Sequence, residues 1–284
     1  MSAPPLLRPV DRRRVSLVRD AATVTQLMAQ DPVSACMVAA RVADHGVDPR
    51  AIGGELWTRG RAERALCFAG ANLIPLRGEA ADLRAFADRA LSAARRCSSV
   101  VGPAELVMTM WDRLRHGWGP ARDVRDQQPL LALRSRPDCV ADPGVRRVYV
   151  NELDAYLVAA VDMFIGEVGV DPRAGDGGRG YRRRVAGLIA AGRAFARFEN
   201  GQVVFKAEVG SQSPAVGQIQ GVWVHPDWRG RGLGTAGTAT VAAAVVNSGR
   251  IASLYVNSFN TVARAAYARV GFRQVGTFAT VLLD

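Results

Sequence analysis

The chain has 284 residues, of which 49% are apolar and 22% are charged, so it can build a sizeable core and does not have the composition of a disordered protein. The formal charge is +11, and the excess is shared by both halves, so neither half is a basic tail. Lys206 is the only lysine, and almost all the positive charge is therefore arginine, which binds phosphates and carboxylates in bidentate geometry. A polyphosphate ligand and a solvated, Arg-biased surface both explain this charge. Only the net charge favours nucleic acid as a partner, since the sequence has no basic stripe with interleaved aromatic residues.

The cysteines and the N-terminus further restrict the class of protein. The four cysteines are about 30 to 40 residues apart, without a C-x-x-C pair or clustered histidines, which predicts free thiols and no metal site. The segment Met1–Arg14 has no apolar stretch after its arginines, so we expect no signal peptide. No apolar run approaches 18 residues, which predicts no transmembrane helix. We therefore expect a cytoplasmic protein without membrane contact.

The N-terminal half contains short elements in a regular order. Strands are predicted at 15–18, 52–58, 65–69, 73–76, 99–101 and 130–134, and helices at 34–44, 79–96 and 103–116. The segment 136–144 carries two prolines and a glycine, which is typical of a connection between domains. The predicted domains are therefore residues 1–140 and 141–284.

The C-terminal half shows clearer periodicity. Strands are predicted at 145–150, 194–198, 202–209, 219–224, 251–256 and 278–283, and helices at 152–168, 181–191, 234–248 and 260–270. Asn200-Gly201 predicts a tight hairpin, and Gly271 a left-handed helix cap. This order predicts an α/β protein with a mixed sheet, in which an antiparallel meander is flanked by helix crossovers. The similar order in the N-terminal half predicts two tandem copies of one fold.

The most informative segment is a glycine-rich turn between a predicted strand and a predicted helix. It comprises Arg229, Gly230, Arg231, Gly232, Leu233, Gly234 and Thr235. Backbone N–H groups at a helix N-terminus have no helical partner, and the helix dipole adds partial positive charge there. Glycines let the backbone approach a ligand closely, so the turn is suited to a pyrophosphate. A purely structural glycine turn is the alternative.

The spacing of this turn separates it from other phosphate loops. Neither G-x-G-x-x-G nor G-x-x-x-x-G-K-[ST] fits, whereas Arg229, Gly232 and Gly234 form R-x-x-G-x-G. After the V-W-V-H-P strand end, this resembles the acetyl-CoA signature of the GCN5-related N-acetyltransferase (GNAT) family. A second segment is similar to another pattern of that family, N-x-x-A-x-x-x-Y-x-x-x-G-F, with Asn260, Ala263, Tyr267, Gly271 and Phe272. The resemblance is strong over residues 145–284 and rests on topology alone in the N-terminal half.

The resemblance implies two tandem GNAT-like acyl-CoA N-acyltransferase domains, with acetyl-CoA as donor. It implies cofactor contacts from Val222, Trp223 and Val224 beside the pantetheine arm, from Arg229 through Thr235 around the pyrophosphate, and from Asn257, Asn260 and Tyr267. The strand carrying Val222 and Val224 would separate from its neighbour and offer unpaired backbone groups to the pantetheine. Tyr267 would protonate the leaving thiolate, and its alternative role is that of a core aromatic.

The general base is where the sequence departs from the family pattern. Some members carry a Glu at the position of Gln218, and glutamine cannot accept a proton at neutral pH. Glu208 on the preceding strand is the candidate we select, although a surface role is an alternative. His225 and Glu167 are further candidates, and a water chain can replace a direct base.

The sequence thus predicts an N-acetyltransferase acting on a primary amine of a small molecule or a protein. A non-catalytic acyl-CoA-binding regulatory module is the alternative, favoured by Gln218. The N-terminal half has only Arg77 and Gly78 between its corresponding strand and helix, so we expect it to lack a pyrophosphate loop and to shape the acceptor cleft. Arg182, Arg183 and Arg184 face either an acidic acceptor or solvent. Acceptor, acyl length and a homodimeric state are left open.

Overall fold

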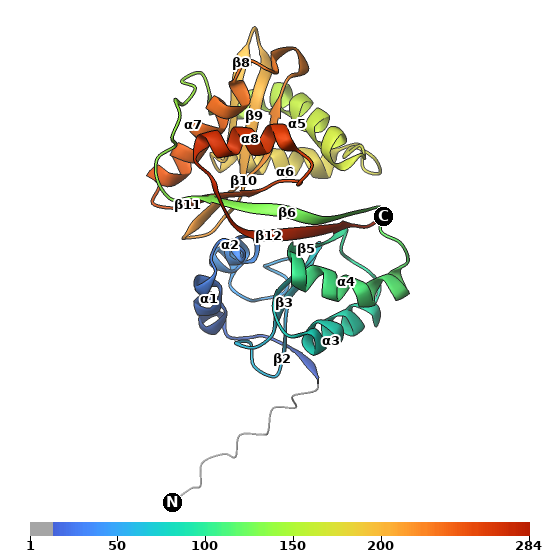
Figure 1. Ribbon diagram of the computed structural model, residues 1–284. Helices are drawn as coiled ribbons and strands as arrows, with labels where there is room; N and C mark the ends of the chain where they lie inside the picture. The colour runs from blue at the N-terminus through green and yellow to red at the C-terminus, as the bar shows by residue number, and fades with distance from the viewer. Residues whose placement is uncertain (1–13) are drawn as a thin grey trace, which may run out of the picture. The chain divides into compact units, whose positions relative to one another are not determined.

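The computed structural model describes residues 14–284, which form two compact units (Figure 1). The first unit comprises the chain up to Gln128 together with Phe278–Asp284, and the second comprises Pro129–Thr277. The segment Met1–Arg14, expected not to be a signal peptide, lies outside the described residues apart from Arg14.

The first unit is a mixed sheet covered by helices. Its strands follow the order β1-β2-β3-β4-β5-β12, where β12 is Arg273–Leu282, with β4 and β5 parallel and the other neighbours antiparallel. The elements in chain order are β1 (Val15–Leu17), α1 (Ala21–Gln30), α2 (Cys36–His45), β2 (Gly54–Arg59), β3 (Leu66–Gly70), β4 (Asn72–Arg77), α3 (Ala80–Leu91), β5 (Ser99–Pro103), α4 (Ala104–Trp118) and the first part of β6 (Asp123–Leu133).

Helix α1 is an element that the periodicity analysis did not predict. Its N-cap is Asp20, whose carboxylate accepts a hydrogen bond from the Ala22 N–H at 3.0 Å. Val24, Leu27 and Met28 bury one face at the i, i+3, i+4 spacing of a helix. An aspartate directly before this apolar spacing is the local signal that would have revealed the helix.

The second unit repeats this plan with longer elements. Its strands follow the order β6-β11-β10-β9-β8-β7, with β10 and β11 parallel and the other neighbours antiparallel. The elements are β7 (Arg146–Arg147), α5 (Leu153–Val168), α6 (Arg179–Ala190), β8 (Ala194–Glu199), β9 (Gln202–Gln212), β10 (Val216–Val224), α7 (Leu233–Asn247), β11 (Ile251–Tyr255), α8 (Thr261–Val270) and β12 (Arg273–Leu282). The predicted α/β class with two tandem copies is confirmed, and so is the hairpin, because Asn200 and Gly201 have φ of 50° and 78°.

The two faces of the second sheet carry different helices. Phe205, Ala207 and Val209 of β9 belong to the core on which α7 packs. Lys206 and Glu208 alternate with them and therefore point to the other face, which is covered by α5 and α6. This opposite face has a buried polar pair where an apolar core would be ordinary.

Each unit takes its last strand from the other half of the chain. Residues 278–282 of β12 pair with β5 in the first unit, and residues 130–133 of β6 pair with β11 in the second. The division therefore falls between Gln128 and Pro129 and is discontinuous, whereas the sequence suggested one boundary within 136–144. The physical reason is that β6 and β12 are long strands that each serve both units.

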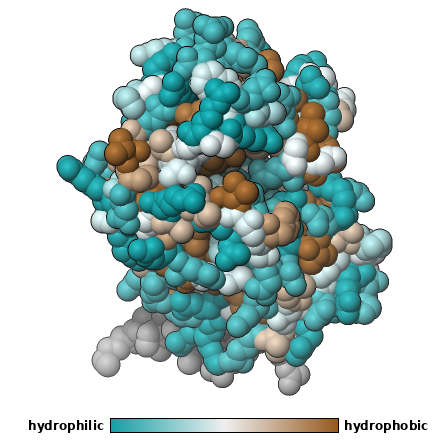
Figure 2. Space-filling model, turned by 45° about the horizontal axis from the view of Figure 1, so that its top comes forward, coloured by the Kyte–Doolittle hydropathy of each residue, from teal (hydrophilic) through white to brown (hydrophobic). Residues whose placement is uncertain are grey.

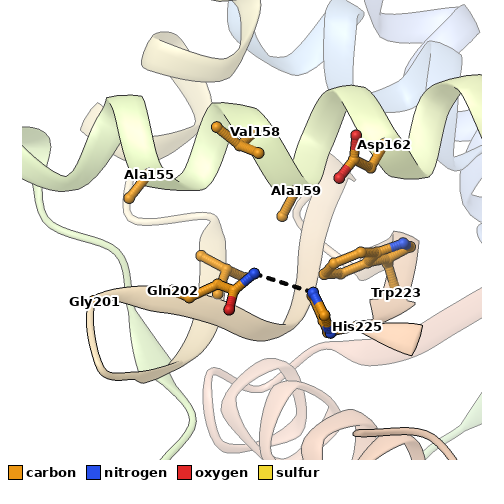
Figure 3. Close-up of a pocket in the computed structure, with 9 residues that line it drawn as sticks. Ala155, Val158, Ala159, Asp162, Gly201, Gln202, Trp223 and His225 are labelled. Carbon is orange, nitrogen blue, oxygen red and sulfur yellow. Dashed lines mark hydrogen bonds between the residues drawn. The ribbon is translucent and has the colours of Figure 1, made fainter. Parts of the chain in front are cut away.

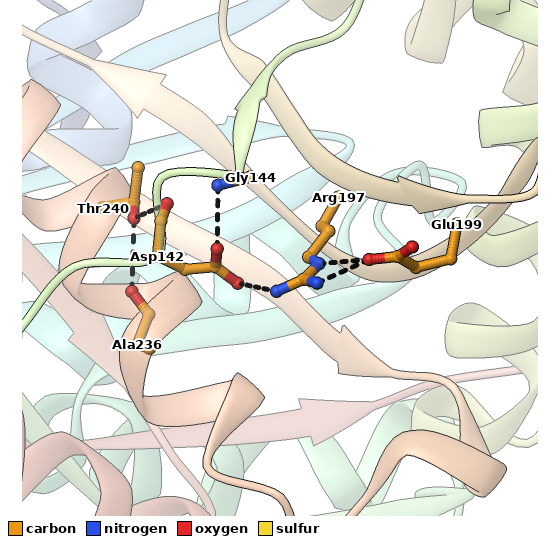
Figure 4. Close-up of polar contacts among 6 residues, drawn as sticks. All are labelled: Asp142, Gly144, Arg197, Glu199, Ala236 and Thr240. Atoms are coloured by element: carbon orange, nitrogen blue, oxygen red, sulfur yellow. Dashed lines mark hydrogen bonds and ion pairs between the residues drawn. The ribbon is translucent and has the colours of Figure 1, made fainter.

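The segment 136–144 is built into the second unit (Figure 4). The buried Asp142 accepts hydrogen bonds from the Gly144 N–H at 2.8 Å and from Arg197 at 3.0 Å. Its carbonyl oxygen accepts a hydrogen bond from the Thr240 hydroxyl of α7 at 2.9 Å. These contacts fasten the segment to β8 and α7, so it is ordered structure rather than a flexible linker.

The face shown in Figure 2 is mostly hydrophilic. On that face, apolar residues appear singly or in small groups among polar ones. Across residues 14–284, no helix combines the length and apolar character needed to cross a membrane.

Candidate functional site

A β-bulge interrupts β10 in the middle of the second sheet. Gln220 pairs with Glu208 and Trp223 pairs with Lys206, so Gly221 and Val222 together oppose the single residue Ala207. Gly221 has a φ of 59°, and a Cβ there would lie 2.9 Å from both the Glu208 Oε1 and the Lys206 Nζ atoms. Glycine is therefore required at this position on conformational and steric grounds.

Beyond the start of β10, its pairing with β11 ends. The two strands pair between Val216–Gln218 and Ile251–Ser253, while β10 itself continues to Val224. The second half of β10 thus presents a strand edge of the kind that binds extended ligands. The carbonyl of Val224, expected to be unpaired, accepts a hydrogen bond from the Arg229 Nε at 3.1 Å.

The glycine-rich turn forms the N-terminus of α7. Gly230 and Gly232 have φ of 75° and 80°, and no atom lies within 4 Å of where their Cβ atoms would be. The helix begins at Leu233, so the N–H groups of its first turn are helical donors without an intrahelical partner. The Arg231 guanidinium lies 5.2 Å from the centre of the Trp228 ring. Dipole, amides and arginines together are suited to binding an anion.

The corresponding helix of the first unit is different. Between β4 and α3 only Gly78 and Glu79 remain. The Asp82 carboxylate accepts a hydrogen bond from the Glu79 N–H at 3.1 Å and is 2.9 Å from Arg59. Acidic side chains of the chain itself therefore occupy this helix start, which disfavours a bound phosphate.

Tyr267 lies on α8 with its side chain buried. Its ring contacts Phe272 edge-on, with 6.2 Å between centroids. Burial raises the pKa of Tyr267 above its ordinary value, and the negative charge of Glu167 raises that pKa further. The hydroxyl therefore keeps its proton at neutral pH, and Glu167, which is on α5, is close enough to act on it electrostatically.

The two asparagines predicted to contact the cofactor organise the start of α8. Asn260 is the N-cap residue, and its Oδ1 accepts a hydrogen bond from the Ala263 N–H at 3.1 Å. The Asn257 carbonyl accepts a hydrogen bond from the Asn260 N–H at 3.0 Å. Both residues thus have a structural function here, and their contact with a cofactor stays a prediction.

Glu208 forms a buried ion pair beside the bulge. The side chains of Lys206 and Glu208 are 0% and 2% exposed, and their Nζ and Oε1 atoms are 3.5 Å apart. Arg184 of α6 lies 3.8 Å from the Glu208 Oε2, which has no hydrogen-bond partner in the described structure. Burial lowers the pKa of Lys206, and the charge of Glu208 opposes that effect. Lys206 was not predicted as a site residue, although its being the only lysine, within a predicted strand, was a usable signal.

A small pocket lies between α5 and the ends of β9 and β10 (Figure 3). Its volume is about 180 Å³, and its polar residues are Asp162, Gln202 and His225. Gln202 and His225 are joined by a 3.0 Å hydrogen bond, and the Trp223 ring forms one wall. Trp223 therefore faces α5, on the side of the sheet opposite α7. The pocket is smaller than ordinary ligand pockets, at roughly 300 Å³ or more.

The fold and the site together define a two-unit mixed-sheet protein with a bulged strand that leads into an open glycine turn at a helix start. Residues 206–281 match the family described as FR47-like protein, and residues 54–156 match a family described as a domain of unknown function, DUF4081. Comparison with curated protein sequences finds no match.

Solved structures resemble the chain over nearly its whole length. A Drosophila protein is 12% identical, with a TM-score of 0.66 and coverage of 95% of this chain and 98% of that one. A GNAT-family acetyltransferase from Colwellia psychrerythraea is 11% identical, with a TM-score of 0.56 and coverage of 95% and 100%. A GCN5-related N-acetyltransferase from Kribbella flavida is 15% identical, with a TM-score of 0.54 and coverage of 87% and 96%. At these identities the likeness establishes the fold. The chain thus shares its fold, over nearly its whole length, with solved structures of GNAT-family acetyltransferases.

Proposed function

We propose that the protein is an N-acyltransferase that moves an acetyl group from acetyl-CoA to a primary amine. The observation that carries the proposal is the continuity of three features along β10 and the turn that follows it. A bulge, a strand edge that has left β11, and an open glycine turn at the start of α7 follow one another within residues 221–235. They match, in order, the thioester, the pantetheine arm and the pyrophosphate of one extended ligand.

The proposal assigns a role to each part of this segment. The amides from Gly230 to Thr235 and the guanidinium groups of Arg229 and Arg231 bind the pyrophosphate. Val222 and Val224 offer backbone groups to the pantetheine, and the bulge supplies an N–H donor for the thioester oxygen. Asn257 and Asn260 adjoin the pantetheine. The proposal places the protein in the cytoplasm.

Tyr267 is the proposed general acid, because a buried, protonated phenol can donate to a leaving thiolate. Glu208 and Glu167 are the candidate bases. If one of them is the base, changing it to glutamine removes the acidic limb of the pH–rate profile, and the other change does not. An unaltered profile in both variants would leave a water chain as the route.

A non-catalytic acyl-CoA-binding module is the second candidate. It is favoured because Gln218 cannot accept a proton and because Glu208 is held in a buried ion pair. Micromolar binding of acetyl-CoA with no acyl transfer to a broad panel of amines would select it.

Calorimetry of acetyl-CoA binding to the wild type, Gly234→Asp and Gly234→Ala tests the cofactor site. A Cβ at Gly234 would have its nearest neighbour at 3.5 Å, so both substitutions fit, and an aspartate at a helix start does not destabilise the helix. We expect Gly234→Ala to retain binding and Gly234→Asp to lose it by roughly tenfold or more, because a carboxylate repels the pyrophosphate. Equal affinities of all three proteins would contradict the proposal.

A further inference from the structure

Lys206 is a fully buried cation in a chain that otherwise uses arginine for every strong base. Its side chain is 0% exposed, and a buried ammonium requires partners that replace its hydration. The structure provides three: the Gly221 carbonyl oxygen at 3.0 Å, the Glu208 carboxylate at 3.5 Å, and the Tyr156 ring with its centre at 5.4 Å. One of these partners is the backbone of the bulge itself.

The hydrogen bond to Gly221 fixes the direction of a whole peptide group. The Gly221 carbonyl and the Val222 N–H belong to one planar trans peptide, so they point in opposite directions. With the carbonyl held by the lysine, the Val222 N–H points away from the Lys206 ammonium, which lies on the α5 and α6 face of the sheet. Val222 itself belongs to the part of β10 that is not paired with β11, where an added strand or extended ligand would lie.

We propose that Lys206 is a positioning residue: by holding the Gly221 carbonyl, it aims the Val222 N–H at the thioester oxygen of the bound acyl-CoA. This inference rests on the proposed function and adds to it the device that orients the oxyanion donor. A donor that is oriented before the substrate binds costs no reorganisation during the reaction.

The surroundings of the bulge explain why such an anchor is needed. Gly221 has a φ of 59° and no side chain of its own to restrict it, so its peptide would otherwise rotate more freely than its neighbours. Glu208 stabilises the ammonium and, with Met163, closes the space around Gly221. Lysine suits this position because its compact ammonium can donate to both the carbonyl and the carboxylate.

Three variants separate the anchor from the ion pair. Lys206→Met removes the bond to Gly221 but leaves Glu208 as a buried charge with only Arg184, at 3.8 Å, beside it. The double variant Lys206→Met with Glu208→Gln removes the bond without leaving a charge, so it can carry the test if the single variant does not fold. Glu208→Gln alone retains the bond, because an amine donates in either protonation state. Calorimetry with acetyl-CoA and with CoA then measures how each variant recognises the acetyl group.

The lysine variants should lose affinity for acetyl-CoA by roughly three- to tenfold, the net worth of one hydrogen bond, while their affinity for CoA is unchanged. Glu208→Gln should keep the wild-type ratio of the two affinities. A wild-type ratio in the double variant would overturn the proposal and make Lys206 merely the counter-ion of Glu208. Binding of neither ligand by the wild type would instead overturn the proposed function.

A ligand-free measurement tests the anchor independently. In protein labelled with ¹⁵N-valine, the Val222 amide should shift and exchange faster with solvent in the double variant than in Glu208→Gln. An identical Val222 amide in both variants would show that Lys206 does not fix this peptide, whatever the outcome with acetyl-CoA.

Discussion

At the scale of single residues, Tyr267 combines two properties of a proton donor. Its side chain is buried, with a pKa that burial raises, and it lies in the second half of α8, the helix whose start Asn257 and Asn260 organise. A core aromatic would share the burial, so only a measurement of turnover separates the two roles.

Changing Tyr267 to Phe keeps the ring and its contact with Phe272 while removing the hydroxyl. We expect kcat to fall by about a hundredfold or more with little change in acetyl-CoA affinity, because general acids typically contribute at least that factor. Tyr181→Phe is the control, since Tyr181 is a half-buried tyrosine of the same unit whose hydroxyl donates to the Ala160 carbonyl at 2.9 Å. Undiminished turnover of Tyr267→Phe would assign the ring to the core.

The buried tyrosines also predict how stability depends on alkaline pH. Burial raises the pKa of Tyr181 from its ordinary value of 10 to about 12, and it raises the pKa of Tyr156 and Tyr267 as well. Unfolded tyrosines ionise near pH 10 while these stay protonated, so the unfolded state binds fewer protons above that pH. The free energy of unfolding should therefore fall as pH rises from about 10 to about 12.

Urea unfolding at pH 9, 10 and 11 measures this slope. Tyr181→Phe should flatten it, whereas Tyr149→Phe, at an exposed position, should leave it as in the wild type. Equal slopes for the two variants would show that the ionisation of Tyr181 does not contribute.

At the scale of elements, the site depends on how closely α7 approaches the sheet. Gly237 lies one turn into this helix, and a Cβ there would come within 2.6 Å of the Phe205 ring. The glycine turn can align with β10 only if the helix is seated at this distance. The apolar and small residues of α7 thus serve packing, whereas Gly230 and Gly232 before it have no neighbour within 4 Å of their Cβ positions.

Gly237→Ala should therefore destabilise the protein by about 1–3 kcal/mol through overpacking. Gly234→Ala, where the added Cβ has room, should change the free energy of unfolding by less than about 1 kcal/mol. Thermal unfolding of the two variants compares them directly. A Gly237→Ala protein as stable as the wild type would mean that α7 can shift outward at no cost.

The sequence allowed most of these elements to be predicted, because helices and strands leave periodic patterns and glycine turns leave local ones. The R-x-x-G-x-G spacing at Arg229–Gly234 predicted the glycine turn before a helix, and α7 begins at Leu233. The bulge at Gly221 and the bond from Lys206 were beyond reach, because both depend on the register between β9 and β10. The pairing of β6 with β11 and of β12 with β5 could not be predicted either, since pairing over long sequence separations leaves no local pattern.

At the scale of the whole molecule, the stability of the first unit depends on residues near the other end of the chain. Val281 is fully buried in the core that also contains Trp57, Trp111 and Leu114. Val281→Ala should cost about 2 kcal/mol of unfolding free energy and should lower the hydrogen-exchange protection of β5, its partner strand. A loss of protection confined to β10 and β11 would contradict this assignment of β12 to the first unit.

The exchange of final strands also constrains how the chain is made. Proteins usually fold from the N-terminus while they are still being synthesised. Here the first unit lacks β12 until residue 282 has left the ribosome, whereas the second unit already has β6 and all its other strands by residue 277. The half of the molecule that is translated first is therefore the half that is completed last.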